Sequence, residues 1–327
     1  MPRKPVLSQP AADHLFALAR GFMGPRVLLT AVELNLFEAL EDRPRSAGEL
    51  ADHLGADLRA MEILLDALAA LGVLREEGGR FSLVEQFAPI LAPGTGGMPL
   101  RHAARLWDVW SGLTECVLSG RPASAGHFEG GAEDWIADIQ ALSRSDVEAL
   151  CRAFDFSRLE RIVDVGGGAG ALALPIAERY AGLRVDIIDS NARALARAED
   201  EARRMMLCDR VVCRQGDFFE FAPSEPYDAA LLSGVLCLFA PEDNLRLLKR
   251  VHEALRGGGH ILVRDIMVHG AQEANRHPAL FAVHLLLVSP TGRVYSADDE
   301  ADLLRKSGFT DLRRIPLKGS QLLIARK

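Results

Sequence analysis

The sequence predicts a mostly parallel α/β domain preceded by a mostly helical domain. The chain has 327 residues, about twice the length of a usual single domain. From Arg161 onwards, strand-like apolar segments alternate with helical ones, which is typical of a parallel sheet covered on both faces. Hydrophobic residues make up 49% of the chain and charged residues 25%, so a disordered or collagen-like protein is excluded.

Residues 1–97 have the pattern of a winged helix. Apolar positions between residues 27 and 40 favour one long helix, and Ser46 with Glu49 has the pattern of a capping box that opens a short helix over 50–54. Asp57 caps the next helix, and two short strands joined through Gly78 and Gly79 follow. The buried face of this second helix is predicted to comprise Met61, Leu64, Leu65, Leu68 and Leu71.

The charge of this region argues against nucleic-acid binding. Residues 1–85 contain nine Arg or Lys and thirteen Asp or Glu, and the whole chain has a net charge of −7. An acidic surface repels a phosphate backbone, so a winged-helix regulator is the weakest interpretation. A winged helix used for packing and dimerisation is the stronger one, because its apolar faces exceed what so small a domain can bury.

Nothing in the sequence predicts export, a membrane span or a metal site. The basic first residues are not followed by the apolar core of a signal peptide, and no uninterrupted apolar run approaches the roughly 18 to 20 residues that span a bilayer. The five cysteines are scattered without a C-x-x-C pair, so we expect reduced thiols in a cytoplasmic protein.

Residues 98–155 read as helices that connect the two domains. They contain all three tryptophans, Trp107, Trp110 and Trp135, which either belong to a core or form the wall of a pocket for a flat ligand. The next five strands are predicted at 162–165, 184–188, 210–214, 227–232 and 260–264. The strands 312–315 and 321–325 are too close in sequence to be parallel, so they form an antiparallel hairpin at the sheet edge.

A glycine-rich turn follows the first of these strands, from Asp164 to Gly170. Glycines at a strand-to-helix turn let the backbone approach a ligand, and the helix N-terminus favours negative charge. Gly166, Gly168 and Ala171 also satisfy the dinucleotide pattern, while Asp189 after the second strand suits ribose hydroxyls of either kind of cofactor. The turn alone does not identify the cofactor.

The ordered set of motifs resembles a class I S-adenosylmethionine (SAM) methyltransferase. The set comprises the glycine turn, Asp189, Asp217 with Phe218, a Gly257–Gly259 turn and the terminal hairpin. Together with the winged helix, it is similar to the plant-type O-methyltransferase family, whose bacterial members tailor secondary metabolites. The resemblance implies a Rossmann-like domain over 156–327, a pocket for a small-molecule acceptor lined by 98–155, and a homodimer through the N-terminal domain. SAM would be the cofactor and S-adenosylhomocysteine (SAH) its product.

The resemblance also implies site residues. The glycines would lie against the methionine part of SAM, Asp189 would bind the ribose, and Asp217 with Phe218 would bracket the adenine. Ser233 stands where plant members have a lysine that helps hold SAM. The expected cofactor residues are Asp164, Gly166, Gly168, Gly170, Asp189, Asp217, Phe218 and Ser233.

At the catalytic position the sequence departs from the family. Cys237 stands where family members carry a histidine base, Asp265 matches the first of two carboxylates that flank it, and Val294 replaces the second. Cys237 is either a structural residue or a substitute base, and His284 is a further candidate on the helix expected to line the acceptor pocket. We therefore expect a methyltransferase acting largely by proximity on a hydroxylated, aromatic or polyketide-like metabolite. The alternatives are C-, N- or S-methyl transfer, or a SAM-binding decarboxylase, hydroxylase or cyclase.

Overall fold

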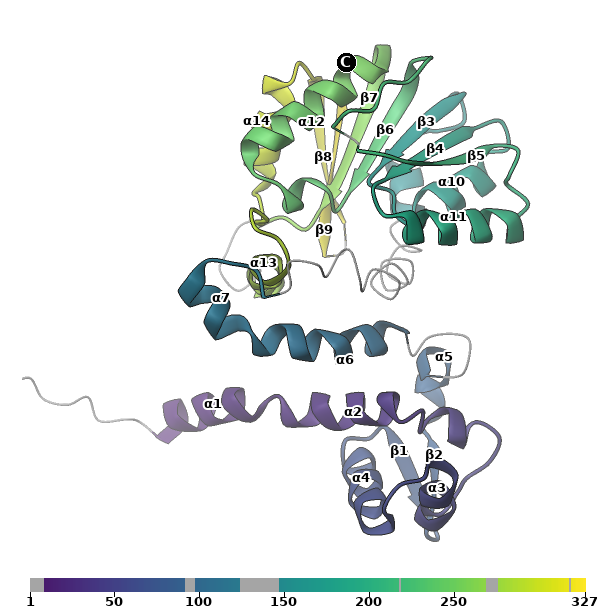
Figure 1. Ribbon diagram of the computed structural model, residues 1–327, viewed down its shortest axis with the longest axis vertical. Coiled ribbons are helices and arrows are strands. Elements are labelled where there is room, and N and C mark those ends of the chain that lie inside the picture. Colours follow the sequence, from purple (N-terminus) through teal and green to yellow (C-terminus); the bar gives the residue numbers. More distant parts are fainter. Residues whose placement is uncertain (1–8, 92–97, 124–146, 218, 269–275, 318) are drawn as a thin grey trace, which may run out of the picture. The chain divides into compact units, whose positions relative to one another are not determined.

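The computed structural model describes residues 9–91, 98–123, 147–217, 219–268, 276–317 and 319–327. The chain divides into two compact units, Met1–Trp107 and Asp108–Lys327 (Figure 1). Phe218 and Trp135 lie outside the described residues.

The first unit contains short helices and one hairpin. Its core is a cluster of buried apolar side chains that includes Leu36, Leu50, Met61 and Leu68. The elements are α1 (Gln9–Arg20), α2 (Met23–Glu33), η1 (Glu38–Leu40), α3 (Ala47–Leu54), α4 (Leu58–Ala70), β1 (Leu74–Glu77), β2 (Arg80–Leu83), η2 (Glu85–Phe87), α5 (Ala88–Leu91) and the start of α6 (Met98–Ser111).

The two helix starts of the winged-helix pattern are observed. Ser46 and Glu49 form the capping box, and the Asp57 side chain accepts a hydrogen bond of 2.9 Å from the backbone N–H of Ala60. The prediction of Leu71 as part of the buried face is wrong. Its side chain is 49% exposed, because α4 ends at Ala70 and Leu71 is the C-cap residue.

The single long helix predicted over residues 27–40 is also wrong. Helix α2 ends at Glu33, and Asn35 adopts a left-handed conformation with φ of 57°. The N–H of Leu36 donates to the carbonyl of Ala31 over 3.0 Å, which is a helix-ending turn of the kind that Asn tolerates. The apolar residues beyond the break, between Leu36 and Leu40, still pack into the core, but from a turn and η1 instead of from a continuous helix.

An apolar face on α1 and the start of α2 is uncovered in the single chain. Five large side chains there are more than half exposed: Leu15, Phe16, Leu18, Phe22 and Met23. Helical residues Pro10–Glu33 are long and apolar enough to cross a membrane, by length and composition alone. The sequence pattern did not predict this, because charged residues interrupt the apolar run. The stretch is broken by a turn between α1 and α2 and carries Arg26, which pairs with Glu33 at 2.8 Å.

The second unit is built on a seven-stranded sheet with the order β5-β4-β3-β6-β7-β9-β8. The first five strands in sequence run parallel, and β9 pairs antiparallel with both β7 and β8, so the predicted hairpin lies at one edge as expected. The strands are β3 (Arg161–Val165), β4 (Arg184–Asp189), β5 (Val211–Gln215), β6 (Tyr227–Ser233), β7 (Leu255–Asp265), β8 (Thr310–Leu317) and β9 (Ser320–Arg326).

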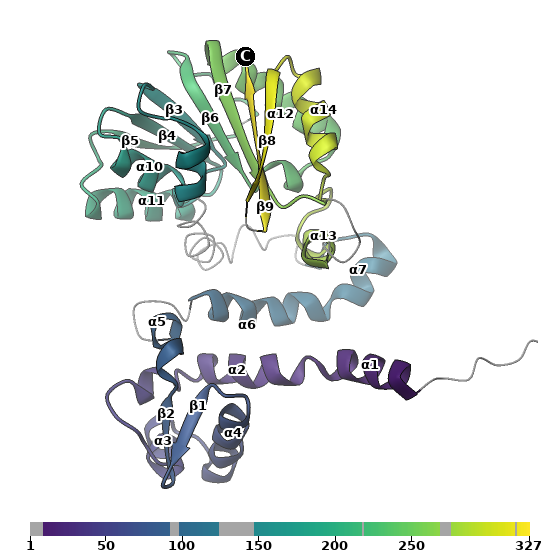
Figure 2. The ribbon, with the colours of Figure 1, turned by 180° about the vertical axis from the view of Figure 1, so that it is seen from behind.

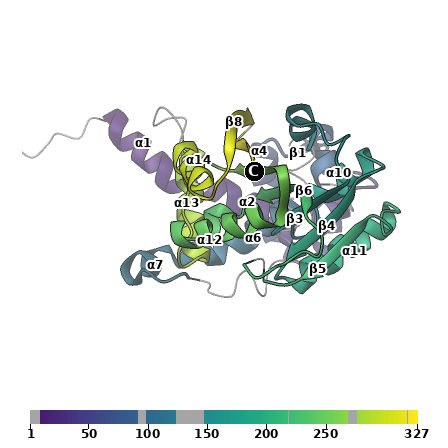
Figure 3. The same ribbon diagram turned by 90° about the horizontal axis from the view of Figure 1, so that it is seen from above.

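Helices cover both faces of this sheet. On one face lie α10 (Ala173–Arg179) and α11 (Ala192–Arg204), and on the other α12 (Pro241–Ala254) and α14 (Ala297–Lys306), as Figures 2 and 3 show. Each face has its own buried apolar cluster. Helix α13 (Arg276–Val288) packs against α7 (Leu113–Ser119), and Trp110 contributes to their shared cluster.

The glycine turn predicted before the fifth strand is instead part of β7. The strand begins at Leu255 and includes Gly257 to Gly259, with Gly258 at a φ of 78°. The pairing with β6 shifts register between Tyr227 and Ala229, so the glycines form an irregularity inside the sheet rather than a loop before it.

Candidate active site

Three of the predicted site residues end strands at one edge of the sheet. Parallel strands bring their carboxyl ends together, and β4, β6 and β7 end at Asp189, Ser233 and Asp265. Asp189 is in register with Gln215 on β5, and Ser233 with Arg264 on β7. The glycine turn after β3 opens at this same edge.

The glycine turn is held against Asp189. The N–H of Gly168 donates to Asp189 Oδ2 over 2.9 Å, and the N–H of Asn191 donates to Oδ1 over 2.8 Å. At Gly170 the φ is 77°, and a Cβ atom would lie 2.8 Å from Leu174, so no larger residue fits without a shift. The backbone of the glycine turn therefore lies against the Asp189 carboxylate, and no glycine side chain separates the two.

Two carboxyl groups make this turn acidic. Asp164 is buried, and its Oδ1 atom has no hydrogen-bond partner among the described residues. Burial, and then the charge of Asp189, raises the pKa of Asp164 to about 7, and burial also raises the pKa of Asp189. Such a site disfavours a pyrophosphate and suits a cofactor that offers hydroxyl donors and positive charge. SAM, with its ribose, ammonium and sulfonium groups, fits these residues.

The residues predicted to bind adenine are described only in part. Asp217 is exposed just beyond β5, and its Oδ1 accepts a hydrogen bond of 2.8 Å from the N–H of Phe219. This bond fixes the turn after the strand. The assignment of Phe218 to the adenine stays a prediction.

Cys237 lies on a short 3-10 turn, η3 (Leu236–Leu238), directly after β6. The turn is held by hydrogen bonds to each backbone carbonyl from residue 236 to residue 239. The shortest to each carbonyl from outside the turn are Asn244 Nδ2 to Leu236 at 2.8 Å, Arg293 N to Cys237 at 2.8 Å, Ser289 Oγ to Leu238 at 3.0 Å and Tyr295 Oη to Phe239 at 2.7 Å. We call this set of contacts the carbonyl clamp.

Most of the clamp comes from the segment that follows α13. Ser289, Arg293 and Tyr295 all lie between α13 and α14, whereas Asn244 is on α12 and is fully buried. The clamp therefore fixes the Cys237 turn to the segment that continues the helix expected to line the acceptor pocket. Sequence reasoning missed it, because backbone carbonyls carry no residue-type signal.

The thiol of Cys237 is neutral in this environment. Its side chain is only 2% exposed. Burial, with the nearby carboxyl groups of Asp265 and Glu300, raises the pKa of Cys237 well above its ordinary value. A thiol held protonated is a poor base and a poor nucleophile.

Glu300 is a site residue that sequence reasoning missed. It lies on α14, is 1% exposed, and its carboxyl group reaches that of Asp265, which is also 1% exposed. The sequence does carry a signal for it, since Glu300 falls on the buried stripe of the helix with Ala297, Ala301 and Leu304.

The histidine candidates differ in exposure. His284 is buried on α13, and its ring stacks on that of Phe281 with centroids 6.0 Å apart. His277 is exposed at the start of the same helix, and Val294, where the resemblance places the family's second carboxylate, is partly buried. A role for His284 in the acceptor pocket stays a prediction.

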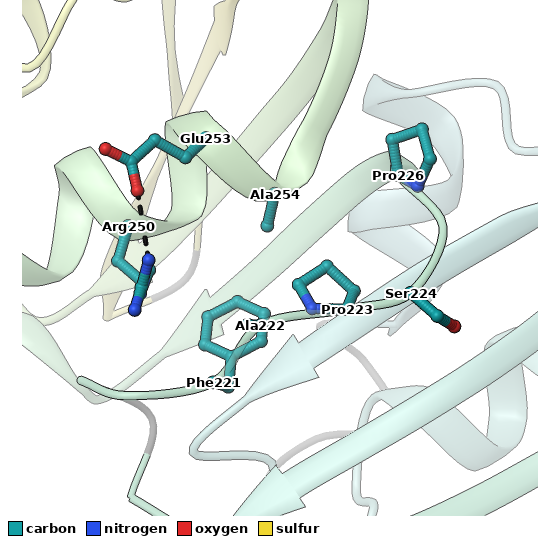
Figure 4. A pocket seen from close by; sticks show the side chains of 8 residues that line it. All are labelled: Phe221, Ala222, Pro223, Ser224, Pro226, Arg250, Glu253 and Ala254. Atoms are coloured by element: carbon teal, nitrogen blue, oxygen red, sulfur yellow. Dashed lines mark hydrogen bonds and ion pairs between the residues drawn. The ribbon is translucent and has the colours of Figure 1, made fainter.

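A separate pocket of about 280 Å³ lies away from the catalytic edge (Figure 4). It lies between α12 and the loop Phe221–Pro226, which ends where β6 begins, so it is near the amino end of that strand. Arg250 and Glu253 on its wall pair with each other at 3.2 Å. The pocket contains none of the predicted site residues.

The fold and the acidic cofactor edge define a class of SAM-binding transferases, and comparisons with known proteins agree. Residues 131–310 match the O-methyltransferase domain, and residues 16–86 match the O-methyltransferase dimerisation domain. The tetracenomycin polyketide synthesis 8-O-methyltransferase TcmO of Streptomyces glaucescens is 30% identical, with 96% of each chain covered. The aclacinomycin 10-hydroxylase RdmB of Streptomyces purpurascens is 31% identical, covering 91% of this chain and 84% of its own.

A solved structure is similar over nearly the whole chain. It is a methyltransferase of calicheamicin biosynthesis in its SAH-bound form, 25% identical, with a TM-score of 0.77 and coverage of 98% of this chain and 99% of its own. The chain belongs to the O-methyltransferase family. The predicted fold, SAM-dependent enzyme class and SAM cofactor are thereby confirmed.

Proposed function

We propose that this enzyme methylates a hydroxyl group of a small aromatic or polyketide-like metabolite and does so without a protein base. The observation that carries the proposal is the buried, neutral Cys237 at the position of the family's histidine, on a turn that the carbonyl clamp fixes beside the cofactor edge. The similarity to TcmO, which acts in polyketide synthesis, supports this acceptor class.

The cofactor would bind at the cofactor edge, where the parallel strands have their carboxyl ends. The turn with Gly166, Gly168 and Gly170 and the carboxyl of Asp164 would hold the methionine part, and Asp189 the ribose hydroxyls. Asp217 and Phe218 would hold the adenine, and Ser233 lies at the end of β6, which neighbours β3 in the sheet. SAM supplies a methyl group on a sulfonium, a good leaving group.

The chain's contribution to catalysis is positioning. The clamp and α13 would hold the acceptor oxygen, and holding two reacting groups in place removes several kcal/mol of barrier. A base adds typically ~10² to 10⁴ in rate only where the acceptor arrives protonated. Asp265 would contact the Cys237 turn and help to hold it, and His284 would line the acceptor pocket. An acceptor that is already ionised needs this positioning but no base.

Purified protein incubated with SAM and a panel of phenols, quinones and thiols tests the proposal. Formation of SAH together with a methylated phenol supports it. Consumption of an acceptor without SAH, or SAH formed only with thiols, contradicts it.

A second candidate is a SAM-binding enzyme that does not transfer methyl, such as a decarboxylase, hydroxylase or cyclase. Two observations favour it specifically. The sequence has Cys237 and Val294 where the resemblance places the family's histidine base and second carboxylate, and RdmB, named a hydroxylase, is 31% identical. Product analysis in the same incubation separates the two.

Replacing Cys237 is expected to change little. Cys237→Ala or Cys237→Ser should keep turnover within a few-fold, because no proton transfer passes through a thiol whose pKa is raised. Cys237→His should give no large gain, since Val294 provides no second carboxylate to orient the imidazole. The pH–rate profile should follow the acceptor's own pKa. A fall in rate of ~10² for Cys237→Ala would show that Cys237 acts as the base.

The protein is expected to be a homodimer. The match to the dimerisation domain covers residues 16–86, and the uncovered apolar face on α1 and α2 needs a partner surface. Light scattering at micromolar concentration should give twice the chain mass of 35.6 kDa. Phe16→Glu should lower that mass toward one chain, whereas Val117→Glu, an exposed apolar position on α7, should not. A monomer for the unmodified protein would overturn the expectation.

A further inference from the structure

Asp265 and Glu300 meet in the interior beside the Cys237 turn. Asp265 is the last residue of β7, and Glu300 lies on α14. The two elements are tied where the N–H of Val268 donates to the carbonyl of Tyr295 over 3.1 Å, just before the N-cap of α14. Each residue is 1% exposed, and the Glu300 side chain lies within interaction range of the Asp265 carboxyl group.

The described residues give these carboxyl groups little help. None of their four oxygens receives a hydrogen bond of ordinary geometry from an N–H or O–H group in the described parts of the chain. Arg264, the Cys237 thiol and the backbone of Leu236 and Gly234 favour the ionised form of Asp265, but burial outweighs them. A buried carboxylate with so few donors is strongly disfavoured, so burial favours keeping a proton on the pair.

Two adjacent buried carboxyl groups cannot both ionise at neutral pH. Burial raises the pKa of both, and for Glu300 the charge of Asp265 and a hydrogen bond to it add to the increase. One proton between them gives one oxygen a donor and leaves a single negative charge. The other groups that influence the pair are Arg264 on β7, which favours ionisation, and Cys237, Tyr295 and Asp299.

We propose that Asp265 and Glu300 share one proton, so that the pair carries one negative charge. Glu300 is thereby a positioning residue, because it holds the Asp265 carboxyl group next to the Cys237 turn. The role of the pair in catalysis rests on the proposed function, whereas the sharing of the proton does not. The lost carboxylate at position 294 is therefore not simply absent. A second carboxyl group, that of the buried Glu300, is supplied from α14.

The dependence of stability on pH tests the shared proton. Above the ordinary carboxyl range the unfolded chain binds no proton at these two residues, while the folded pair binds one. The unfolding equilibrium constant should therefore rise about tenfold more per pH unit in the unmodified protein than in Glu300→Gln, until the folded pair loses its last proton. Asp302→Asn, the same charge change on the exposed face of α14, should keep the slope of the unmodified protein.

Asp265→Asn should remove the same slope, which keeps the test valid if one variant folds poorly. Parallel slopes for the unmodified protein and for either of these two site variants would overturn the proposal. Infrared spectra give an independent measurement, since a single protonated-carboxyl band should be lost on either substitution. A band that survives in one variant assigns the proton to the remaining residue alone and also overturns the sharing.

Activity reports on the positioning role. The acceptor's own pKa sets the rising part of the pH–rate profile. At more alkaline pH, where the pair loses its last proton, the turnover of the unmodified protein should decline, and Glu300→Gln should abolish that decline. A decline of equal size in both proteins would refute the positioning role. If the protein transfers no methyl group, this measurement fails while the stability and infrared results stand, so the two failures are distinguishable.

Discussion

Replacing Asp189 by alanine should lower the affinity for SAM and SAH by on the order of 10²-fold. Two hydrogen bonds to a charged acceptor would be lost, each contributing about 1.5 to 3 kcal/mol. The same substitution releases the N–H groups of Gly168 and Asn191, which now donate to Asp189 over 2.9 and 2.8 Å, so the glycine turn would also lose its anchor. Calorimetric titration with SAH measures the effect.

Asp189→Asn is the matched control for this prediction. It keeps one side-chain oxygen as an acceptor and should bind SAH more tightly than Asp189→Ala but more weakly than the unmodified protein. NAD and NADP should not bind to any of the three, because the buried Asp164 makes the turn unsuitable for a pyrophosphate. Unchanged SAH affinity in Asp189→Ala, or tight NAD binding, would refute the assignment of this edge to SAM.

Loss of Asn244 should have the next largest effect, on turnover rather than on cofactor affinity. The fully buried side-chain amide donates to the carbonyls of Leu236 and Phe239, over 2.8 and 3.3 Å. Asn244→Ala would leave these buried acceptors with fewer donors, at about 1 to 3 kcal/mol of stability, and would let the Cys237 turn move. A displacement of about 1 Å at a reacting site costs on the order of 10²-fold in rate.

Steady-state kinetics with SAH binding measured in parallel separates the two effects. Tyr295→Phe removes another clamp donor, the hydroxyl that binds the Phe239 carbonyl, and should lower turnover in the same direction. Asp243→Ala, at the partly buried neighbour of Asn244 on α12, should not. Turnover of Asn244→Ala within a few-fold of the unmodified protein would mean that the clamp does not position the site.

The cofactor edge was predictable because it follows from strand order and local chemistry. Alternating apolar segments identify parallel strands, and parallel strands place the residues at their carboxyl ends, such as Asp189 and Asp265, at one edge. The capping residues Ser46 and Asp57 were predictable for the same reason, because a helix start is a local signal.

Features that depend on packing were not predictable in this way. Leu34 and Leu36 continue an apolar pattern past the end of α2, but the left-handed Asn35 ends the helix between them. Gly258 reads as a loop residue and lies inside β7, because a neighbouring strand accommodates the irregularity. Glu300 is charged, a residue type that is seldom fully buried, and only its place on the buried stripe of α14 indicates that it lies inside.

The carbonyl clamp separates the backbone of the catalytic turn from the identity of its side chains. Every clamp contact is made to a main-chain oxygen, and such an oxygen is present whatever residue occupies positions 236 to 239. The residue at position 237 can therefore be exchanged while the turn keeps its shape. A protein with this scaffold can lose, regain or replace its base by a single substitution, so its chemistry can change while its fold stays the same.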